Sequence, residues 1–444
     1  MNHKTFLRSK NVKRFIEEKL EDWKNKEYRK PLVLHGARQV GKTWIMKAFG
    51  RHSFESVVYI NFENNERMKR SFEIDYDIRR ILSDLEIESR QKIIPEQMLI
   101  IFDEIQEAPK AMTALKYFAE EAPEYYVIAA GSLLGMSLHE GTSFPVGKVD
   151  ILKMYPMTFG EFLVAAGHQQ LYEALQNNQL NTIATFKDQY LELLKRYYYI
   201  GGMPEAVQRY IDTDDLTQVR NIQKNLLLYY ESDFSKHVPY HHLPRIQMVW
   251  NSIPAQLAKE NRKFVYGIVR EGSRAKDYEI AIQWLQDYGL VTLCHRVKKP
   301  GIPLIAYMEQ ASFKMYILDV GLLGAKADLD AKTILNGNDI FVEFKGALTE
   351  QFIAQELSAA ELKLYYYSTE NSSGEIDFLL QMNNGVVPIE VKAQENLKAQ
   401  SLRNYCKKYT PETAIRTSMS GFRQETWMIN VPLFYFLEYV KSKM

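Results

Sequence analysis

The stretch of sequence that decides the fold reads Gly36-Ala37-Arg38-Gln39-Val40-Gly41-Lys42-Thr43. It matches the pattern G-x-x-x-x-G-K-[ST], it follows a short apolar run, and a helix-forming stretch comes directly after it. The glycines allow the backbone to curl so that its N–H groups point into one concavity at the start of the helix. These eight residues predict a loop that binds the phosphates of ATP, with Lys42 at the β- and γ-phosphates and the Thr43 hydroxyl on Mg²⁺.

Short apolar runs continue on both sides of this loop and are separated by helix-like stretches. The runs that we interpret as strands are Leu32–Leu34, Val57–Ile60, Leu99–Phe102, Tyr126–Ala129 and Val149–Leu152. Strands that are apolar throughout are typical of a parallel sheet that helices cover on both faces. The sequence therefore predicts an α/β fold with a parallel sheet of the P-loop NTPase type.

Two adjacent carboxylates, Asp103 and Glu104, follow the third of these runs. Ligands of open α/β sheets bind at the carboxyl edge, so both side chains should face the phosphate loop. We expect Asp103 to hold Mg²⁺ together with Thr43, and Glu104 to act as the general base for the attacking water. Ser132 follows the next predicted strand and is a candidate for sensing the γ-phosphate or orienting that water, with a helix N-cap as the alternative.

The composition is that of a globular protein and excludes several classes. The 444 residues suit about three domains of roughly 150 residues each. Lys and Arg number 56 against 55 Asp and Glu, so the charge excludes a surface of one sign but permits a local basic groove. Two cysteines cannot build a disulfide framework or a four-cysteine zinc site. The polar N-terminus and the lack of an apolar run near roughly 20 residues predict a cytoplasmic protein with no membrane partner.

A second candidate site lies near the other end of the chain, in the triplet Glu390-Val391-Lys392. Two alternating runs flank Asn384-Gly385, which is a strong signal for a type I′ turn. With a two-residue loop, Asp377 lies opposite Lys392 and diagonal to Glu390, and all three share one face. The carboxylates can bind Mg²⁺ and the ammonium can stabilise a pentavalent phosphate. The alternative is a half-solvated hairpin with ordinary surface charges.

The segment between the two candidate sites is basic, since residues 262–299 hold eight Lys or Arg against four Asp or Glu. Its pattern predicts a capped helix over 273–290 and a hairpin formed by 291–293 and 304–307. The tip of that hairpin, 298–301, contains two lysines. A helix followed by a basic hairpin predicts a contact with DNA. A module that only packs between two domains is the alternative.

Several segments together resemble prokaryotic AAA-type ATPases of the AAA+ superfamily that carry a C-terminal domain of unknown function. These segments are Gly36–Thr43, Ile100–Glu104, Ala130–Leu133, Tyr155–Phe162, Gly201–Val207, Met315–Leu323 and Gly346–Leu357. The resemblance implies an ATPase core with a leading helix (1–160), a helical lid (161–260), a winged-helix segment (261–329) and a C-terminal domain (330–444). It also implies that this last domain has the α/β restriction-endonuclease-like fold of PD-(D/E)XK nucleases.

The resemblance bears on single residues as well. Glu350, on a predicted helix, matches the acidic helix position of PD-(D/E)XK domains and would complete a nuclease site with Asp377, Glu390 and Lys392. Members of the family often carry Arg where this chain has Gly147-Lys148. Because Lys lacks the bidentate fork of Arg, we assign no arginine finger.

Two functions are consistent with these residues. The first is a Mg²⁺-dependent ATPase that acts on DNA and carries a nuclease-like C-terminal domain. The second is an ATP-gated regulatory switch whose C-terminal domain binds a protein or DNA partner without cleaving it. The charged residues of the C-terminal hairpin favour the first function, and the near-neutral net charge favours the second. Both functions need ATP and Mg²⁺, and both are compatible with an oligomer.

Overall fold

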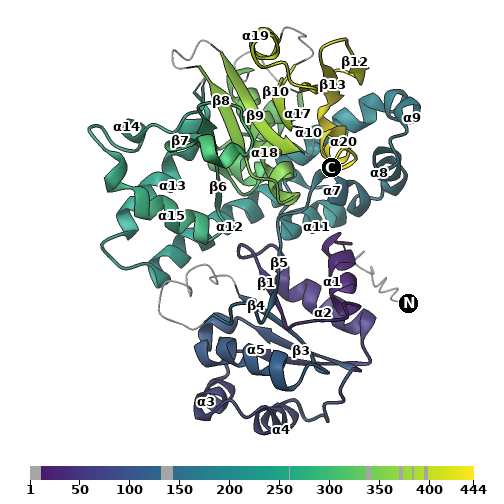
Figure 1. The fold of residues 1–444 in the computed structure, drawn as a ribbon, viewed down its shortest axis with the longest axis vertical. Coiled ribbons are helices and arrows are strands. Elements are labelled where there is room, and N and C mark those ends of the chain that lie inside the picture. Colours follow the sequence, from purple (N-terminus) through teal and green to yellow (C-terminus); the bar gives the residue numbers. More distant parts are fainter. Residues whose placement is uncertain are drawn as a thin grey trace, which may run out of the picture. The chain divides into compact units, whose positions relative to one another are not determined.

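A computed structural model describes residues 12–131, 144–259, 261–336, 342–369, 374–382, 385–394 and 399–444 (Figure 1). The chain divides into two compact units. The N-terminal unit comprises residues 14–155 with the short segment 287–289, and the C-terminal unit comprises 156–286 and 290–444. Within the described ranges, every helix is too short or too polar to cross a lipid bilayer.

The N-terminal unit is built on a five-stranded sheet in the order β2-β3-β4-β1-β5, and every neighbouring pair of strands is parallel. The strands are β1 (Leu32–His35), β2 (Ser56–Asn61), β3 (Met98–Asp103), β4 (Tyr126–Gly131) and β5 (Asp150–Lys153). The helices are α1 (Ile16–Lys24), α2 (Lys42–Ser53), α3 (Glu66–Ile74), α4 (Ile78–Ser89), η1 (Ile105–Glu107) and α5 (Pro109–Glu121). Each predicted strand is present to within a residue or two, so the predicted parallel α/β sheet is confirmed.

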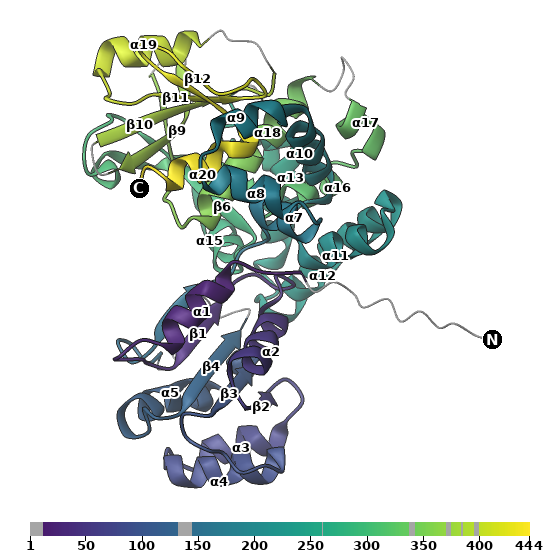
Figure 2. The same cartoon turned by 90° about the vertical axis from the view of Figure 1, so that its right-hand side faces the viewer.

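Helices α3, α4 and α5 cover one face of this sheet and form its main core (Figure 2). Alternate strand residues such as Ile60, Phe102 and Ala129 point into that core, because successive side chains of a strand face opposite sides. The rings of Phe72 and Phe102 meet edge to face, with their centroids 5.6 Å apart. This packing fixes β3, and with it the position of the carboxylates at its end.

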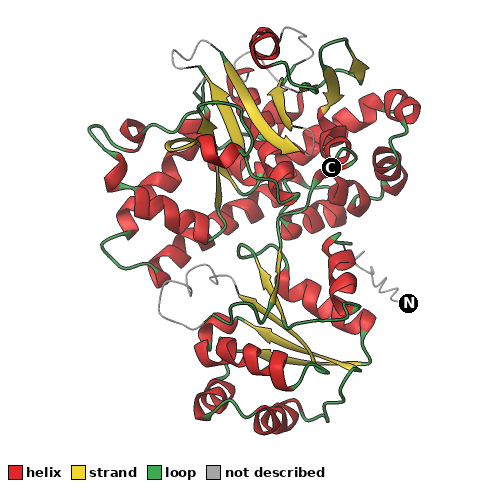
Figure 3. Cartoon of the chain, in the orientation of Figure 1, coloured by secondary structure: helices red, strands yellow, loops and turns green. Residues whose placement is uncertain are grey.

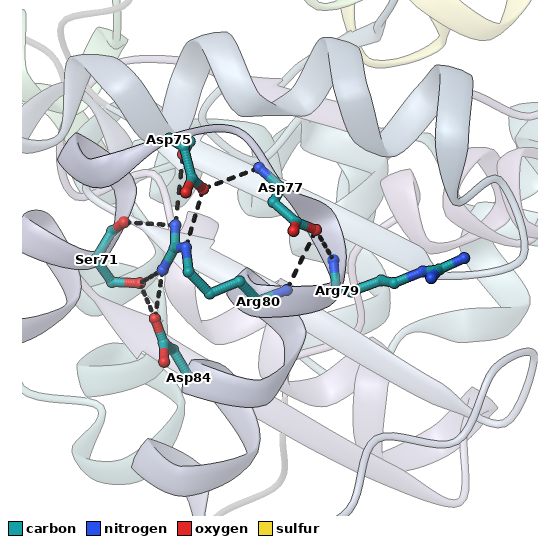
Figure 4. A network of polar contacts seen from close by, with 6 residues as sticks. All are labelled: Ser71, Asp75, Asp77, Arg79, Arg80 and Asp84. Atoms are coloured by element: carbon teal, nitrogen blue, oxygen red, sulfur yellow. Dashed lines mark hydrogen bonds and ion pairs between the residues drawn. The ribbon is translucent and has the colours of Figure 1, made fainter.

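A charged network joins α3 to α4 (Figure 4). The Arg80 guanidinium donates to Asp84 at 2.6 Å, to the Ser71 hydroxyl at 3.1 Å and to Asp75 at 2.9 Å. The Asp77 carboxylate caps α4 by accepting from the backbone N–H of Arg80 at 3.4 Å. One arginine therefore holds the end of α3, the following turn and the first turn of α4 in a single arrangement.

The C-terminal unit begins with a run of helices (Figure 3). These are α7 (Phe159–Ala165), α8 (Gln169–Gln176), α9 (Leu180–Thr185), α10 (Lys187–Ile200), α11 (Pro204–Thr213), α12 (Leu216–His237) and α13 (Leu243–Leu257). Later helices are α14 (Tyr266–Val269), η2 (Ala275–Asp277), α15 (Glu279–Asp287), η3 (Leu304–Tyr307), α16 (Val320–Lys326), α17 (Ala331–Asn336), α18 (Val342–Ala359), α19 (Gln400–Tyr409), η5 (Leu433–Tyr435) and α20 (Phe436–Lys441).

An eight-stranded mixed sheet completes this unit, in the order β12-β13-β11-β10-β9-β8-β6-β7. The strands are β6 (Val291–Val297), β7 (Met308–Ile317), β8 (Tyr365–Ser368), β9 (Glu375–Met382), β10 (Gly385–Val391), β11 (Ile415–Ser418), β12 (Arg423–Gln424) and β13 (Ile429–Pro432).

The expected wing differs from the observed hairpin in two ways. Residues 304–307 form the 3₁₀ helix η3, and the second strand of the hairpin is β7, which starts at Met308. The hairpin is also not a separate two-stranded wing, because β6 pairs in parallel with β8 and so belongs to the same sheet as the C-terminal strands. A pairing between strands about 70 residues apart leaves no local signal in the sequence, which explains the difference.

The C-terminal hairpin has a register two residues away from the predicted one. Gly385 pairs with Met382, and Ile389 pairs with Phe378, so the next pair along places Asp377 opposite Glu390. The prediction of Lys392 opposite Asp377 is corrected accordingly. The reason is that Gly385 opens β10 instead of occupying the turn. Because the shift is two residues, every side chain keeps its predicted face.

Four of the segments that carry the family resemblance meet around Asp319, which is fully buried at the start of α16. The Asp319 carboxylate accepts from the backbone N–H of Gly202 at 2.6 Å and from Gln355 of α18 at 3.3 Å. The carbonyl of Gly202 in turn accepts from the N–H of Met157 at 2.7 Å. Burial raises the pKa of Asp319 to about 6, and the hydrogen bonds from Gly202 and Gln355 act against that rise. The segments therefore share a structural role within the C-terminal unit.

This packing predicts that Gly202→Ala destabilises the protein. A Cβ at Gly202 would overlap the backbone carbonyl of Met157, which cannot move without losing the hydrogen bonds around Asp319. We expect a loss of about 3 kcal/mol, measured as a lowered midpoint in thermal or urea unfolding of the full chain. Gly421→Ala is the matched control, since nothing lies within 4 Å of its added Cβ. Equal shifts for the two variants would contradict the prediction.

Candidate nucleotide-binding site

The phosphate loop joins β1 to α2 with the conformation that its glycines allow. Gly41, directly before α2, has φ 95° and ψ 22°, in the left-handed region that favours glycine. Gly36 lies so close to the carbonyl of Met154 that no larger residue fits there without movement. Ala37 and Val40 are buried, with exposed fractions of 4% and 0%. The loop is therefore held from behind by the core, and its form depends on two glycines at set positions.

The ammonium of Lys42 lies inside the loop that precedes it. Its Nζ donates to the carbonyls of Gly36 at 2.9 Å and Ala37 at 2.8 Å, and only 7% of the residue is exposed. Burial lowers the pKa of Lys42 to about 8, although the carboxylates of Glu104 and Asp103 act in the opposite direction. A buried ammonium that lies inside the loop is well placed to bind an anion such as a phosphate.

The Thr43 hydroxyl donates to Asp103 Oδ2 at 2.7 Å, although the two residues are 60 positions apart in the chain. Tyr59, on β2, donates to the same oxygen at 2.9 Å. The pair offers a hydroxyl and a carboxylate, which are the hard oxygen ligands that Mg²⁺ prefers, so these residues fit the ion. The structure thus brings together the two side chains that the sequence assigns to Mg²⁺.

Glu104 follows β3 in a left-handed conformation, with φ 50° and ψ 47°. Such a backbone is uncommon for a residue with a side chain and is found at functional sites. Its Oε2 accepts from the side chain of Gln106 at 2.6 Å, which restrains the carboxylate. Gln106 was not predicted from the sequence, because a glutamine two residues after a carboxylate carries no signal on its own.

Arg14 is a second residue that the sequence analysis did not identify. Its guanidinium donates to the carbonyl of Val40 in the phosphate loop at 2.9 Å and to the carbonyl of Tyr155 at 2.7 Å. It therefore connects the loop to the segment that follows β5.

Two further residues of the sequence analysis remain to be placed. Ser132 lies outside the described residues. Lys148, where the family often has Arg, forms an ion pair with Glu120 at 2.7 Å.

The residues predicted for a nuclease site are placed in the C-terminal unit as follows. Glu350, on α18, is bound by the guanidinium of Arg262, the ammonium of Lys314 at 2.8 Å and the hydroxyl of Tyr316. Asp377 Oδ2, on β9, accepts from the backbone N–H of Val391 at 2.7 Å.

The two remaining residues of the predicted nuclease site pair with each other. Glu390 Oε1 contacts the Lys392 ammonium at 2.7 Å, while its other oxygen is buried without a partner among the described residues. Within the described part of the chain, no group of three or more His, Cys, Asp or Glu is arranged to hold a metal ion. Cations of the protein itself, Lys314, Arg262 and Lys392, therefore pair with the carboxylates of Glu350 and Glu390.

Comparison with known families agrees with the geometry of the phosphate site. Residues 28–163 match the model of a family described as an AAA domain. Residues 191–333 and 345–434 match two further families, the domains of unknown function DUF8612 and DUF4143. A search of curated proteins finds no match.

Solved structures similar to this chain include a Walker-type ATPase of Pyrococcus abyssi, which is 16% identical over 72% of this chain and 97% of its own, with a TM-score of 0.44. The ORC2 protein of Aeropyrum pernix, in its ADPNP-ADP complexes, is 14% identical over 78% and 95%, with a TM-score of 0.36. The ORC1 protein of that organism, in complex with DNA, is 13% identical over 70% and 90%, with a TM-score of 0.29.

The class of the N-terminal unit follows from the family match and from its site. A phosphate loop after the first strand of a parallel sheet, with Asp103 bonded to Thr43, is the arrangement of a P-loop nucleotide-binding domain. The N-terminal unit therefore has the arrangement of a P-loop nucleotide-binding domain, and most of it matches the AAA-domain model.

The lowered pKa of Lys42 predicts how nucleotide affinity depends on pH. Bound phosphates should raise this pKa above its value of about 8 in the free protein, so the protonated lysine stabilises the complex. This contribution is complete below pH 8 and is lost as the pH rises through the pKa of the complex. We expect affinity for a fluorescent ATP analogue to be constant near neutral pH and to fall up to about tenfold per unit in alkaline solution.

Lys42→Ala is the control for this measurement. Without the ammonium, affinity should be low at every pH and the alkaline decline should disappear, while circular dichroism shows the variant folded. A wild-type affinity that stays flat to about pH 9.5 would contradict this prediction.

Proposed function

We propose that the N-terminal unit binds ATP with Mg²⁺ and hydrolyses the bond to its γ-phosphate. The observation that carries this proposal is the hydrogen bond of 2.7 Å between Thr43 and Asp103, beside the buried ammonium of Lys42. This hydrogen bond joins the phosphate loop to the end of β3. A nucleotide bound with Mg²⁺ needs the Thr43 hydroxyl and the Asp103 carboxylate close together at this place. When bound there, Mg²⁺ would neutralise part of the charge on the phosphates.

Each residue of the site has a distinct part in this proposal. The N–H groups of the loop and of the first turn of α2 would surround the phosphates, and Lys42 would exchange the carbonyls of Gly36 and Ala37 for phosphate oxygens. Glu104 would accept the proton of the attacking water. Gln106 would hold the Glu104 carboxylate in place through the contact of 2.6 Å.

For the C-terminal unit we favour the second of the two functions, a switch that binds a partner without cleaving it. The observation in its favour is that Arg262 and Lys314 are ion-paired with Glu350, the residue that matches the acidic helix position of nucleases. The hairpin tip at 298–301 supports DNA as the partner, since 70% of the Lys298 side chain is exposed. The restriction-endonuclease-like fold and the winged helix remain proposals that rest on the family resemblance.

The role of Glu104 gives the sharpest test of hydrolysis. In Glu104→Gln the shape of the side chain is kept but the proton acceptor is removed, so ATP should still bind. Turnover should fall by about 10²- to 10⁴-fold, measured as phosphate release at saturating ATP. Glu107→Gln, the same change three residues along the chain, should keep its turnover. If affinity for ATP falls together with turnover in Glu104→Gln, this residue maintains the site and is not its base.

A DNA partner predicts that duplex DNA accelerates ATP turnover by the full-length chain. The double variant Lys298→Glu and Lys299→Glu should lose this acceleration, because the tip would repel the phosphate backbone. The measurement is the ratio of phosphate release with and without DNA, at low and at high salt. A ratio of one for the wild-type protein would point to a protein partner instead.

A further inference from the structure

Three carboxylates from two elements of the C-terminal unit surround one ammonium group. The Nζ of Lys314, on β7, lies 2.8 Å from Glu350 Oε1, 2.6 Å from Glu375 Oε1 and 3.8 Å from Asp377 Oδ1. Glu350 comes from α18, whereas Glu375 and Asp377 come from β9. We call these four residues the Lys314 cluster. Lys314 has no exposed surface, and 1% of Glu350 is exposed.

The register of the sheet explains how Lys314 reaches this position. Lys314 pairs with Cys294 of β6, and Ser368 of β8 pairs with Glu375 of β9, so these side chains follow one face of the sheet. The ammonium lies 5.1 Å from the centre of the Tyr366 ring, which belongs to the intervening strand β8. The Lys314 side chain therefore extends from β7 across the neighbouring strands, and its ammonium contacts the carboxylate of Glu375 on β9.

Several oxygens of these carboxylates already have partners within the protein. Glu350 is bound by Arg262 on one oxygen, and by Lys314 and Tyr316 on the other. Asp377 accepts from the N–H of Val391 on the oxygen that does not face Lys314. A divalent ion would need several of these oxygens within about 2.0–2.6 Å, and it would have to approach a fixed positive charge. The residues present do not fit such an ion.

The charges in this region support the same conclusion. The three carboxylates face two cations, Lys314 and Arg262. Burial alone would lower the pKa of Lys314, but the carboxylates outweigh that effect and the pKa rises above its ordinary value. Burial and the neighbouring Glu350 raise the pKa of Asp377 to about 7.

We infer that the ammonium of Lys314 takes the place of a metal ion among the carboxylates of Glu350, Glu375 and Asp377. The cluster is then complete in the protein as folded, and it needs no divalent cation. The inference concerns the C-terminal unit alone and does not depend on ATP hydrolysis by the N-terminal unit. It implies that ligand binding by this unit does not require Mg²⁺ or Mn²⁺ at the cluster.

The test measures binding of Mn²⁺ to the nucleotide-free full-length chain by the loss of the free-ion signal in electron paramagnetic resonance. The phosphate site is unchanged in all variants, so differences in stoichiometry report on the cluster. Wild type and Asp377→Asn should bind the same number of ions. Lys314→Ala leaves buried carboxylates without the Lys314 ammonium, so this variant should gain one Mn²⁺ site. Saturating Mn²⁺ should then raise the Tm of this variant by about 5 °C.

Two controls keep the result decisive. Lys298→Ala removes a lysine from the same hairpin that pairs with a single carboxylate, Glu309, at 3.5 Å, and it should gain no ion. The Mn²⁺ site gained in Lys314→Ala should be lost when Asp377→Asn is added.

Two outcomes would overturn the inference. One is a Mn²⁺ site in the wild-type protein that depends on Asp377, and the other is a folded Lys314→Ala variant that gains no ion. The comparison of wild type with Asp377→Asn also stands if Lys314→Ala does not fold.

Discussion

A charged side chain removed from water must be paired or hydrogen-bonded, and this constraint shapes both polar centres of the chain. Each unit contains a buried lysine among its described residues, and the surroundings of the two lysines differ. Lys42 lies against neutral carbonyls, and burial lowers its pKa to about 8. Lys314 lies among three carboxylates, which raise its pKa above the ordinary value. Burial disfavours the charged form of the first lysine, whereas the surrounding carboxylates favour the charged form of the second.

Much of the geometry of the phosphate loop and of the residues that follow β3 could be predicted from the sequence. The chemistry of this site is local: the loop, the strand before it and the helix after it are contiguous, and Asp103 ends an unbroken apolar run. Parallel strands bring their carboxyl ends to one edge, so even the contact between Thr43 and Asp103 follows from the order of the elements. What the sequence did not provide were the supporting residues Arg14, Tyr59 and Gln106, whose roles depend on side-chain geometry.

The C-terminal site was predicted only in part, because its contacts are long-range. The face shared by Asp377 and Glu390 follows from alternation alone, whereas their register depends on where the turn begins, and Gly385 starts the strand. Lys314 and Arg262 come from segments that the sequence analysis assigned to a separate winged-helix part. The pairing of β6 with β8 brings that part into the C-terminal sheet, and no local pattern indicates this.

The difference between an ammonium and a metal ion decides what chemistry such a cluster can support. A divalent ion accepts a water molecule as ligand and lowers its pKa, which creates a nucleophile at neutral pH. An ammonium has three donors and no site for a ligand, so it can fix carboxylates but cannot activate water in this way. The Lys314 cluster therefore joins β7, β9 and α18 through ion pairs. Under the proposed function, the covalent chemistry of the chain belongs to the phosphate site, and the C-terminal unit contributes recognition.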